Sequence, residues 1–203
     1  MAYERVARAT LAKLGKVNFL FNNAGVGSFS PAGETPLADW QWVVNVNLLG
    51  VAYGVELFLP GMRELDEPCF IMNTASLAGH LANSHFGPYN ATKFAVVGYS
   101  EGLRLELEGS KVGVAVLCPA WVKTRIAESG RNHPDPARAQ AAAGDLNPIA
   151  QIIQSEGIAV ERLVERALDA MADGTLNVFT HPDFWPLVEA RLERLQAEYR
   201  QVL

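Results

Sequence analysis

Short, nearly continuous apolar runs alternate with helical stretches along the chain, and this alternation limits the fold more than any other feature. Apolar runs expected to form strands lie at 17–21, 69–74, 112–117 and 176–180. Helical patterns lie between and around them, at 6–14, 36–59, 89–108, 160–172 and 185–201. Strands that are apolar throughout are typical of parallel sheets covered on both faces. The sequence therefore predicts an α/β fold with a doubly wound parallel sheet.

Composition removes several classes of function. The 203 residues carry a formal net charge of −5 and no basic cluster, so nucleic acid is not expected as a partner. Val43–Leu59 is the longest apolar stretch, but Asn, Gly and Glu residues interrupt it, which favours a buried helix over a membrane span. Met1–Leu14 has no signal-peptide pattern, so the expected location is the cytoplasm. The four His residues show no ligand spacing, and no metal site is expected.

The length fits one domain spanning residues 1–203. Within it, residues 121–148 are polar and Ala-rich with several Pro and Gly, and we interpret them as a mobile substrate flap. The two cysteines, Cys69 and Cys118, each border an apolar run and are expected to be small buried hydrophobic residues.

Ligands of open parallel sheets bind beyond the carboxyl ends of the strands. The segments at that edge are Asn22–Gly25, Thr74–Gly79 and Cys118–Thr124. These three segments are therefore the first candidates for a binding site.

Tyr89 and Lys93 are four residues apart on one predicted helix, so their side chains share a face. An ammonium close to a phenol lowers the phenol pKa, and such a phenol can act as a general acid or base. Ser76 follows a strand at the ligand edge, where its hydroxyl could hold a substrate oxygen. The alternatives are that the Tyr–Lys spacing arises by chance and that Ser76 caps a turn.

Asn47 lies in an apolar helix, where an amide without a partner would be costly. It either supports a water relay from Lys93 to solvent or packs and bends the helix. Asn45 satisfies the same criteria, and composition alone does not distinguish the two.

Taken together, these motifs resemble the short-chain dehydrogenase/reductase family, in order and in spacing. The resemblance extends from the first helix to the end of the chain. It rests on Asn22-Asn23-Ala24-Gly25, Val46-Asn47-Leu48-Leu49-Gly50, Ser76, Tyr89-Asn-Ala-Thr-Lys93 and Cys118-Pro119-Ala-Trp-Val-Lys-Thr124.

The resemblance implies a Rossmann-like fold and an NAD(P)-dependent oxidoreductase that transfers a hydride between nicotinamide and a carbonyl or alcohol. It selects Asn47 over Asn45 and implies a catalytic tetrad of Asn47, Ser76, Tyr89 and Lys93, in which Ser76 and Tyr89 also contact the substrate. It further implies cofactor contacts, for NAD or NADP, from Asn23, Ala24, Gly25, Tyr89, Lys93, Pro119, Val122 and Thr124.

Two positions depart from the family pattern. Ala120 stands where the family usually has Gly, a change we expect to be tolerated. The Gly-rich βαβ segment that binds the cofactor pyrophosphate is not found, so the fold is expected to be N-terminally truncated, without the family's first three strands and two helices. Two crossover units would amount to roughly 60 residues. Without them, the strand at 17–21 would lie at an open apolar edge.

Three interpretations of this truncation remain open: a fragment or mis-started reading frame, a degenerate relative without activity, and a chain that borrows the missing half. The competing function is a catalytically inactive protein that serves as an association scaffold. For the enzyme, a hydrophobic small-molecule substrate is expected from Leu77, Leu81, Phe86, Trp121 and Ile126. A homodimer or homotetramer is expected by analogy.

Overall fold

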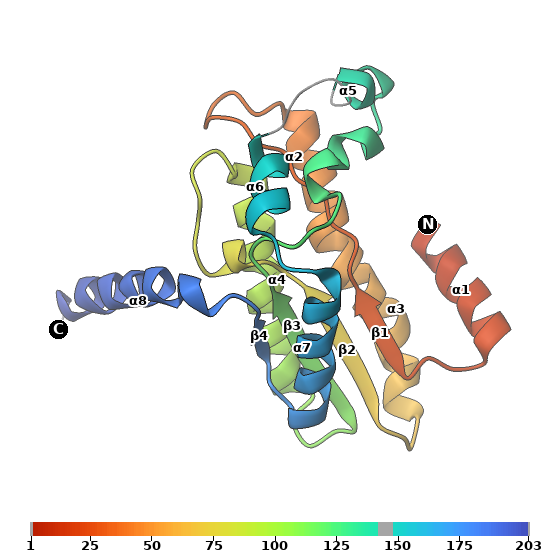
Figure 1. The fold of residues 1–203 in the computed structure, drawn as a ribbon. Helices are drawn as coiled ribbons and strands as arrows, with labels where there is room; N and C mark the ends of the chain where they lie inside the picture. Colours follow the sequence, from red (N-terminus) through yellow and green to blue (C-terminus); the bar gives the residue numbers. More distant parts are fainter. Residues whose placement is uncertain (1, 142–147, 203) are drawn as a thin grey trace.

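A parallel sheet forms the centre of the computed structural model, which describes residues 2–141 and 148–202. Its four strands stand side by side in chain order: β1 (Phe19–Asn22), β2 (Cys69–Thr74), β3 (Val112–Cys118) and β4 (Asn177–Phe179). In the middle of the sheet, Ile71 pairs with Leu20 on one side and Val114 on the other. These strands confirm the predicted α/β fold with a parallel sheet (Figure 1).

Helices cover both faces of the sheet, as expected for strands that are apolar throughout. Neighbouring residues of one strand point to opposite faces. Ile71 packs in the core beneath α3 (Gly50–Glu64) and α4 (Gly87–Glu106), whereas Met72 packs beneath α7 (Val160–Asp173). The cysteines agree with their prediction, since both are free and buried in these cores.

β1 lies at one edge of the sheet and is poorly covered on one face. The side chains of Phe19 and Phe21 are 46% and 43% exposed, and the Phe19 ring lies 6.5 Å from that of Phe70 on β2. On α7, Val164 and Leu168 are also exposed. The open apolar edge expected at 17–21 is thus confirmed for the part of the chain that the structure describes.

The long apolar stretch before β2 is not one helix that ends at Pro60. It forms α2 (Leu37–Val44), a π-helical turn (Asn45–Leu49) and α3, which continues through Pro60 to Glu64. Pro60 is exposed, while Leu59 and Met62 beside it are buried in the core and hold this last part of the helix.

The dipeptide Thr35-Pro36 predicts Thr35 as the N-cap of that helix, with Pro36 at its first helical position, and this prediction is wrong. Pro36 occupies the cap position, and no side-chain hydrogen bond caps the helix. The Thr35 hydroxyl instead pairs with the Ser30 hydroxyl, so the loop uses the group that the helix was expected to use.

The remaining boundaries agree with the predictions to within a few residues. α1 (Ala2–Leu14) ends at Gly15, whose φ of +77° is the left-handed conformation common after helices. At the other end of the chain, a short 3-10 helix (Pro182–Phe184) leads into α8 (Trp185–Arg200).

The expected flap contains more regular structure than its composition suggested. It includes a 3-10 helix (Ile126–Asn132), α5 (Pro136–Ala141) and the start of α6 (Pro148–Glu156). α6 was not predicted, although Ile149 and Ile153 lie at helical spacing. Residues 142–147 of the flap lie outside the described residues, and its mobility stays a prediction.

Residues Leu37–Glu64, which form α2, the π-helical turn and α3, are long and apolar enough to cross a membrane. Composition does not separate such a span from a core helix. Val43, Val51 and Val55 are buried within this chain, and Val51 and Val55 pack in cores with residues of β2, β3 and α4. That packing favours a core helix, as the sequence predicted; the cellular compartment stays a prediction.

Candidate active site

A cavity of about 490 Å³ opens at the carboxyl ends of the strands. Segments that follow β1, β2 and β3 meet there, as the parallel topology requires. Nearly all of the site residues predicted from the sequence line it: Asn23, Ala24, Gly25, Ser76, Tyr89, Lys93, Pro119, Val122 and Thr124. Asn47 is not part of the lining and lies buried behind it.

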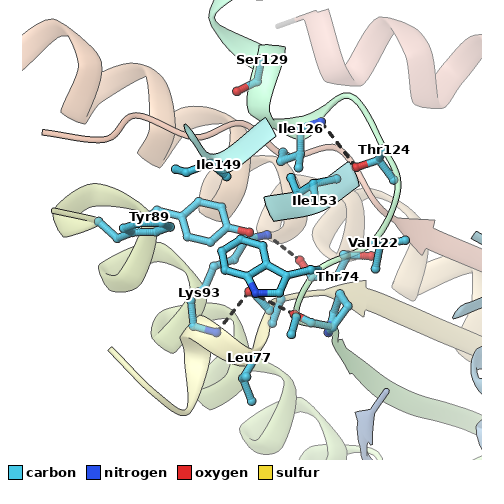
Figure 2. Close-up of a pocket in the computed structure, with 18 of the residues that line it drawn as sticks. Thr74, Leu77, Tyr89, Lys93, Val122, Thr124, Ile126, Ser129, Ile149 and Ile153 are labelled. Atoms are coloured by element: carbon cyan, nitrogen blue, oxygen red, sulfur yellow. Dashed lines mark hydrogen bonds between the residues drawn. The ribbon is translucent and has the colours of Figure 1, made fainter. Parts of the chain in front are cut away.

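Tyr89 and Lys93 enter the cavity from the first turns of α4. Pro88 lies in the first turn, where its missing N–H costs no helical hydrogen bond, so the helix begins just before Tyr89. The Lys93 Nζ atom lies 5.5 Å from the centroid of the Tyr89 ring. Figure 2 shows both side chains projecting from the same helix toward the pocket. The predicted shared face is therefore present.

The Lys93 ammonium is held in a buried position. Its side chain is 2% exposed and donates a hydrogen bond of 2.9 Å to the carbonyl oxygen of Thr74, at the end of β2. Burial lowers the Lys93 pKa from 10.5 to about 8, because the charged form loses its hydration. Two of its three N–H donors are left for a ligand, since Thr74 is the partner found among the described residues.

The pKa of Tyr89 differs from the expectation. Burial raises it above its usual value, and a hydrogen bond with Ser76 opposes the rise. Lys93 was expected to lower it. The ammonium instead lies over the ring and bonds to Thr74, so it does not offset the burial of the phenol.

Ser76 caps a turn and also reaches the phenol. Its hydroxyl accepts a hydrogen bond from the backbone N–H of Ala78 (3.1 Å) and donates one to the carbonyl oxygen of Pro119 (3.3 Å). The same hydroxyl is the hydrogen-bond partner that lowers the Tyr89 pKa. The two interpretations of Ser76 are therefore compatible, because the turn fixes the hydroxyl beside Tyr89.

Asn47 connects the helix to the loop after β1. Its Oδ1 accepts from the backbone N–H of Val26 (2.8 Å), and its Nδ2 donates to the Val26 carbonyl (2.9 Å) and to Thr92 Oγ1 (3.2 Å). Asn47 lies in the π-helical turn, a distortion frequent at functional sites. Asn45 is exposed, and its Oδ1 accepts a hydrogen bond from Gln41. The structure therefore also distinguishes Asn47, which is buried, from Asn45.

Gly25 lies between Lys93 and Asn47. A methyl group at this position would lie 3.6 Å from Lys93 Nζ and 3.7 Å from Asn47 Oδ1. The loop after β1, helix α4 and the end of β2 thus meet around the Lys93 ammonium, which retains two N–H donors for a ligand. Such donors suit the hydroxyl groups of a sugar, so the residues present fit a nicotinamide nucleotide.

The segment after β3 is held on the opposite wall of the cavity. The N–H of Lys123 donates to the Ile158 carbonyl, and the N–H of Ile158 donates to the Trp121 carbonyl, both at 2.9 Å. This pairing sets Val122 and Thr124 on the lining. Ala120 has no positive φ, so its methyl group causes no backbone strain, as expected.

The predicted apolar lining is present in full, since Leu77, Leu81, Phe86, Trp121 and Ile126 all border the cavity. Sequence reasoning missed further lining residues, chiefly Phe29, Ser129, Ile149, Ile153, Phe184 and Leu187. Ile149 and Ile153 were detectable as a helical pair. Ile126, Ile149 and Ile153 lie on the flap side of Tyr89 in Figure 2.

Ser129 fastens the flap to the loop after β1. Its hydroxyl accepts from the N–H of Gly27 (2.9 Å) and donates to the Gly27 carbonyl (3.3 Å). The side chain is buried, so these bonds form away from water. No sequence motif indicated this contact, because the two residues lie 102 positions apart.

Comparisons with known proteins agree with this site. A profile of the family described as short chain dehydrogenase matches residues 1–135. A C alpha-dehydrogenase from a Sphingobium species is 34% identical over 185 residues, which cover 90% of this chain and 61% of that protein. A CLA biosynthesis dehydrogenase/reductase from Lactiplantibacillus plantarum is 27% identical over 91% of this chain and 68% of its own length. The chain therefore spans about two thirds of these curated relatives.

Solved structures show the same relationship. A short-chain dehydrogenase/reductase from Burkholderia phymatum, solved in complex with NAD, is 37% identical with a TM-score of 0.87, covering 97% of this chain and 72% of that one. A protein from Novosphingobium aromaticivorans, titled a putative short-chain dehydrogenase, is 33% identical with a TM-score of 0.80 and covers 97% and 63%. On the matched profile and these relatives, the chain belongs to the short-chain dehydrogenase/reductase family.

Proposed function

We propose that this protein is an NAD(P)-dependent oxidoreductase that interconverts a carbonyl and an alcohol, with Tyr89 as the acid and base. One observation supports this most strongly. The phenol of Tyr89, the hydroxyl of Ser76 and the ammonium of Lys93 border one cavity at the ligand edge of the sheet. A non-catalytic scaffold would have no need of this arrangement.

The nicotinamide, when bound, donates or accepts the hydride. In the reducing direction, Tyr89 would give its hydroxyl proton to the oxygen of the carbonyl substrate. In the oxidising direction, Tyr89 takes the alcohol proton. Ser76 orients the substrate oxygen, because the Ala78 N–H and the Pro119 carbonyl hold its hydroxyl at the cavity wall.

Lys93 would hold the ribose of a bound nicotinamide nucleotide with the N–H donors that Thr74 leaves free. A methyl group on Gly25 would contact both Lys93 Nζ and Asn47 Oδ1, so the ammonium and the amide border the same part of the loop after β1. Asn47 therefore positions the loop after β1 and supports the path by which the Tyr89 proton is replaced. Asn23, Ala24, Gly25, Pro119, Val122 and Thr124 are proposed as the further contacts of the cofactor, which is either NAD or NADP.

The substrate is a hydrophobic carbonyl or alcohol. Aromatic and aliphatic side chains from three parts of the chain surround Tyr89, and the ring of Phe29 lies 4.5 Å from that of Phe86 and 6.2 Å from that of Tyr89. An apolar substrate body would bind against these side chains at little desolvation cost.

Cofactor titration followed by nicotinamide fluorescence tests the proposal. We expect saturable binding together with turnover of a generic hydrophobic ketone. Tyr89→Phe should lower turnover by about 10²–10⁴-fold while cofactor binding is retained. Tyr99→Phe on the same helix is the matched control and should leave turnover unchanged.

Unchanged turnover in Tyr89→Phe would overturn the role of Tyr89. No binding at millimolar cofactor would overturn the oxidoreductase proposal for this chain and would support the association scaffold instead.

A further inference from the structure

The imidazole of His181 lies just beyond the point where β3 and β4 stop pairing. The last paired residues of the two strands are Cys118 and Phe179. Continuing this register by two residues would bring Ala120 opposite His181, but both residues lie outside the strands. The backbone polar groups of the segment after β3 therefore need partners other than a neighbouring strand.

The His181 ring supplies two of these partners. Its Nδ1 accepts a hydrogen bond from the backbone N–H of Ala120 at 3.3 Å, and its Nε2 lies 3.0 Å from the carbonyl oxygen of Trp121. One side chain thus bonds to two consecutive residues of the segment that leaves the sheet. We call this pair of contacts the His181 clamp.

The two contacts determine where the ring carries its proton. A backbone N–H can only donate a hydrogen bond, and a backbone carbonyl can only accept one. Nδ1, which faces Ala120, must therefore be unprotonated, whereas Nε2, which faces Trp121, must carry the proton. The Thr180 hydroxyl lies 2.7 Å from Nδ1 and can donate to it as well. The clamp thus requires the neutral imidazole, because a proton on Nδ1 would face the Ala120 N–H and break that contact.

The surroundings of His181 favour the neutral ring. Burial lowers the His181 pKa below its usual value, while the hydrogen bond to Trp121 and the charge of Asp183 oppose the fall. In the part of the chain that the structure describes, Asp183 is the charged group found to act on this ring. Residues 119–121, which the ring contacts, carry no titratable side chain. The clamp is therefore intact near neutral pH and weakens as the pH falls.

The segment that the clamp holds reaches the cavity at two places. Pro119, next to the clamped residues, accepts hydrogen bonds at its carbonyl oxygen from the Ser76 hydroxyl (3.3 Å) and from the N–H of Leu77 (2.8 Å). On the other side of the clamp, Val122 and Thr124 line the cavity. A shift of the segment would therefore displace both the Ser76 hydroxyl and this wall.

We propose that His181 is a positioning residue for the reaction: it holds residues 119–121 so that Ser76 and the cofactor contacts keep their places. This inference rests on the proposed function, in which Ser76 orients the substrate oxygen and Pro119, Val122 and Thr124 contact the cofactor. His181 is not part of the cavity lining, so it acts through the segment that it bonds.

Nuclear magnetic resonance of the free chain tests the clamp without any cofactor. Long-range proton–nitrogen spectra of histidine rings distinguish a protonated ring nitrogen from an unprotonated one. We expect His181 to carry its proton on Nε2 at neutral pH. As the pH falls, the Ala120 amide resonance should shift with the same midpoint as the His181 ring. A proton on Nδ1 at neutral pH, or an Ala120 amide that does not follow the ring, would overturn the proposal.

Cofactor titration and steady-state kinetics test the role in the reaction. His181→Phe keeps a ring but removes both hydrogen bonds, and we expect it to raise the cofactor Kd about ten-fold and to lower kcat. His181→Asn keeps an acceptor for the Ala120 N–H, so it should recover part of this loss. It should also abolish the rise in Kd that the wild type shows at acid pH. His85→Asn makes the same change at an exposed histidine and is the matched control.

The control should change neither Kd nor kcat. Unchanged values in His181→Phe, an equal effect of His85→Asn, or an acid-side rise in Kd that persists in His181→Asn would each contradict the role of His181. If the wild type itself binds no cofactor, the proposed function fails, while the ring and amide spectra still decide whether His181 holds the segment.

Discussion

Lys93 donates a 2.9 Å hydrogen bond to the carbonyl oxygen of Thr74, and this bond ties α4 to the end of β2, a central strand of the sheet. The two residues come from neighbouring segments, α4 and β2, and both line the cavity. The bond fixes the ammonium beside the Tyr89 ring, although burial makes the charged form costly. The hydrogen bond to Thr74 therefore helps to keep Lys93 charged at a position where burial by itself favours the neutral amine.

The buried charge predicts a specific pH dependence of stability. Burial lowers the Lys93 pKa from 10.5 to about 8, so between these values the unfolded chain binds more protons than the folded chain. Stability conferred by this group therefore rises with pH across that window. Relative to Lys93→Met, the wild type should gain on the order of 3 kcal/mol between pH 8 and 10.5. Urea unfolding of both proteins at several pH values measures the difference, and a pH-independent difference would contradict the assignment.

Replacing Asn47 should loosen the loop after β1. Asn47→Leu leaves the buried N–H and carbonyl of Val26 without their partner, which should cost about 3 kcal/mol. Asn45→Leu removes only an exposed hydrogen bond and should change stability by less than about 0.5 kcal/mol. Thermal unfolding of the two variants decides the point, since equal shifts would show that Asn47 has no special structural role.

Gly54 is required because α3 approaches β1 closely. A methyl group there would lie 2.2 Å from Asn22 Oδ1, and the Asn22 side chain is itself tied to Asn73 by a 2.9 Å hydrogen bond. Gly54→Ala should therefore destabilise the protein by about 1–3 kcal/mol. Gly61→Ala on the same helix meets no atom within 4 Å and should stabilise it by up to about 1 kcal/mol. Chemical denaturation of both variants should give opposite signs.

The Ser129 contact with Gly27 should affect substrate binding more than the chemical step. Ser129→Ala removes both hydrogen bonds and frees the flap from the loop at the cavity wall. We expect KM for a hydrophobic ketone to rise several-fold with little change in kcat. Ser155→Ala, which removes only hydrogen bonds of an exposed side chain on α6, should alter neither value. Steady-state kinetics test this, and a fall in kcat without a change in KM would contradict it.

Much of the fold was readable from local patterns. β2 and β3 were predicted to within one residue because each is a buried apolar run bounded by turn residues. The start of α2 was also predicted to within one residue, but the end of α3 was not, because core packing around Leu59 and Met62 outweighs the local preference of Pro60 to stop a helix. α6 was missed because its apolar pair lies in an otherwise polar, Ala-rich segment.

Sequence alone determined which chemical groups the site would contain, since helical spacing puts Tyr89 and Lys93 on one face and strand ends gather Ser76 and the loop after β1 at one edge. Only the tertiary structure decided their electrostatic state and their neighbours. Burial, not the nearby ammonium, controls the Tyr89 pKa, and the partners of Asn47 and Ser129 lie far along the chain. Desolvation and long-range contacts depend on packing from every layer, and no local pattern of residues encodes them.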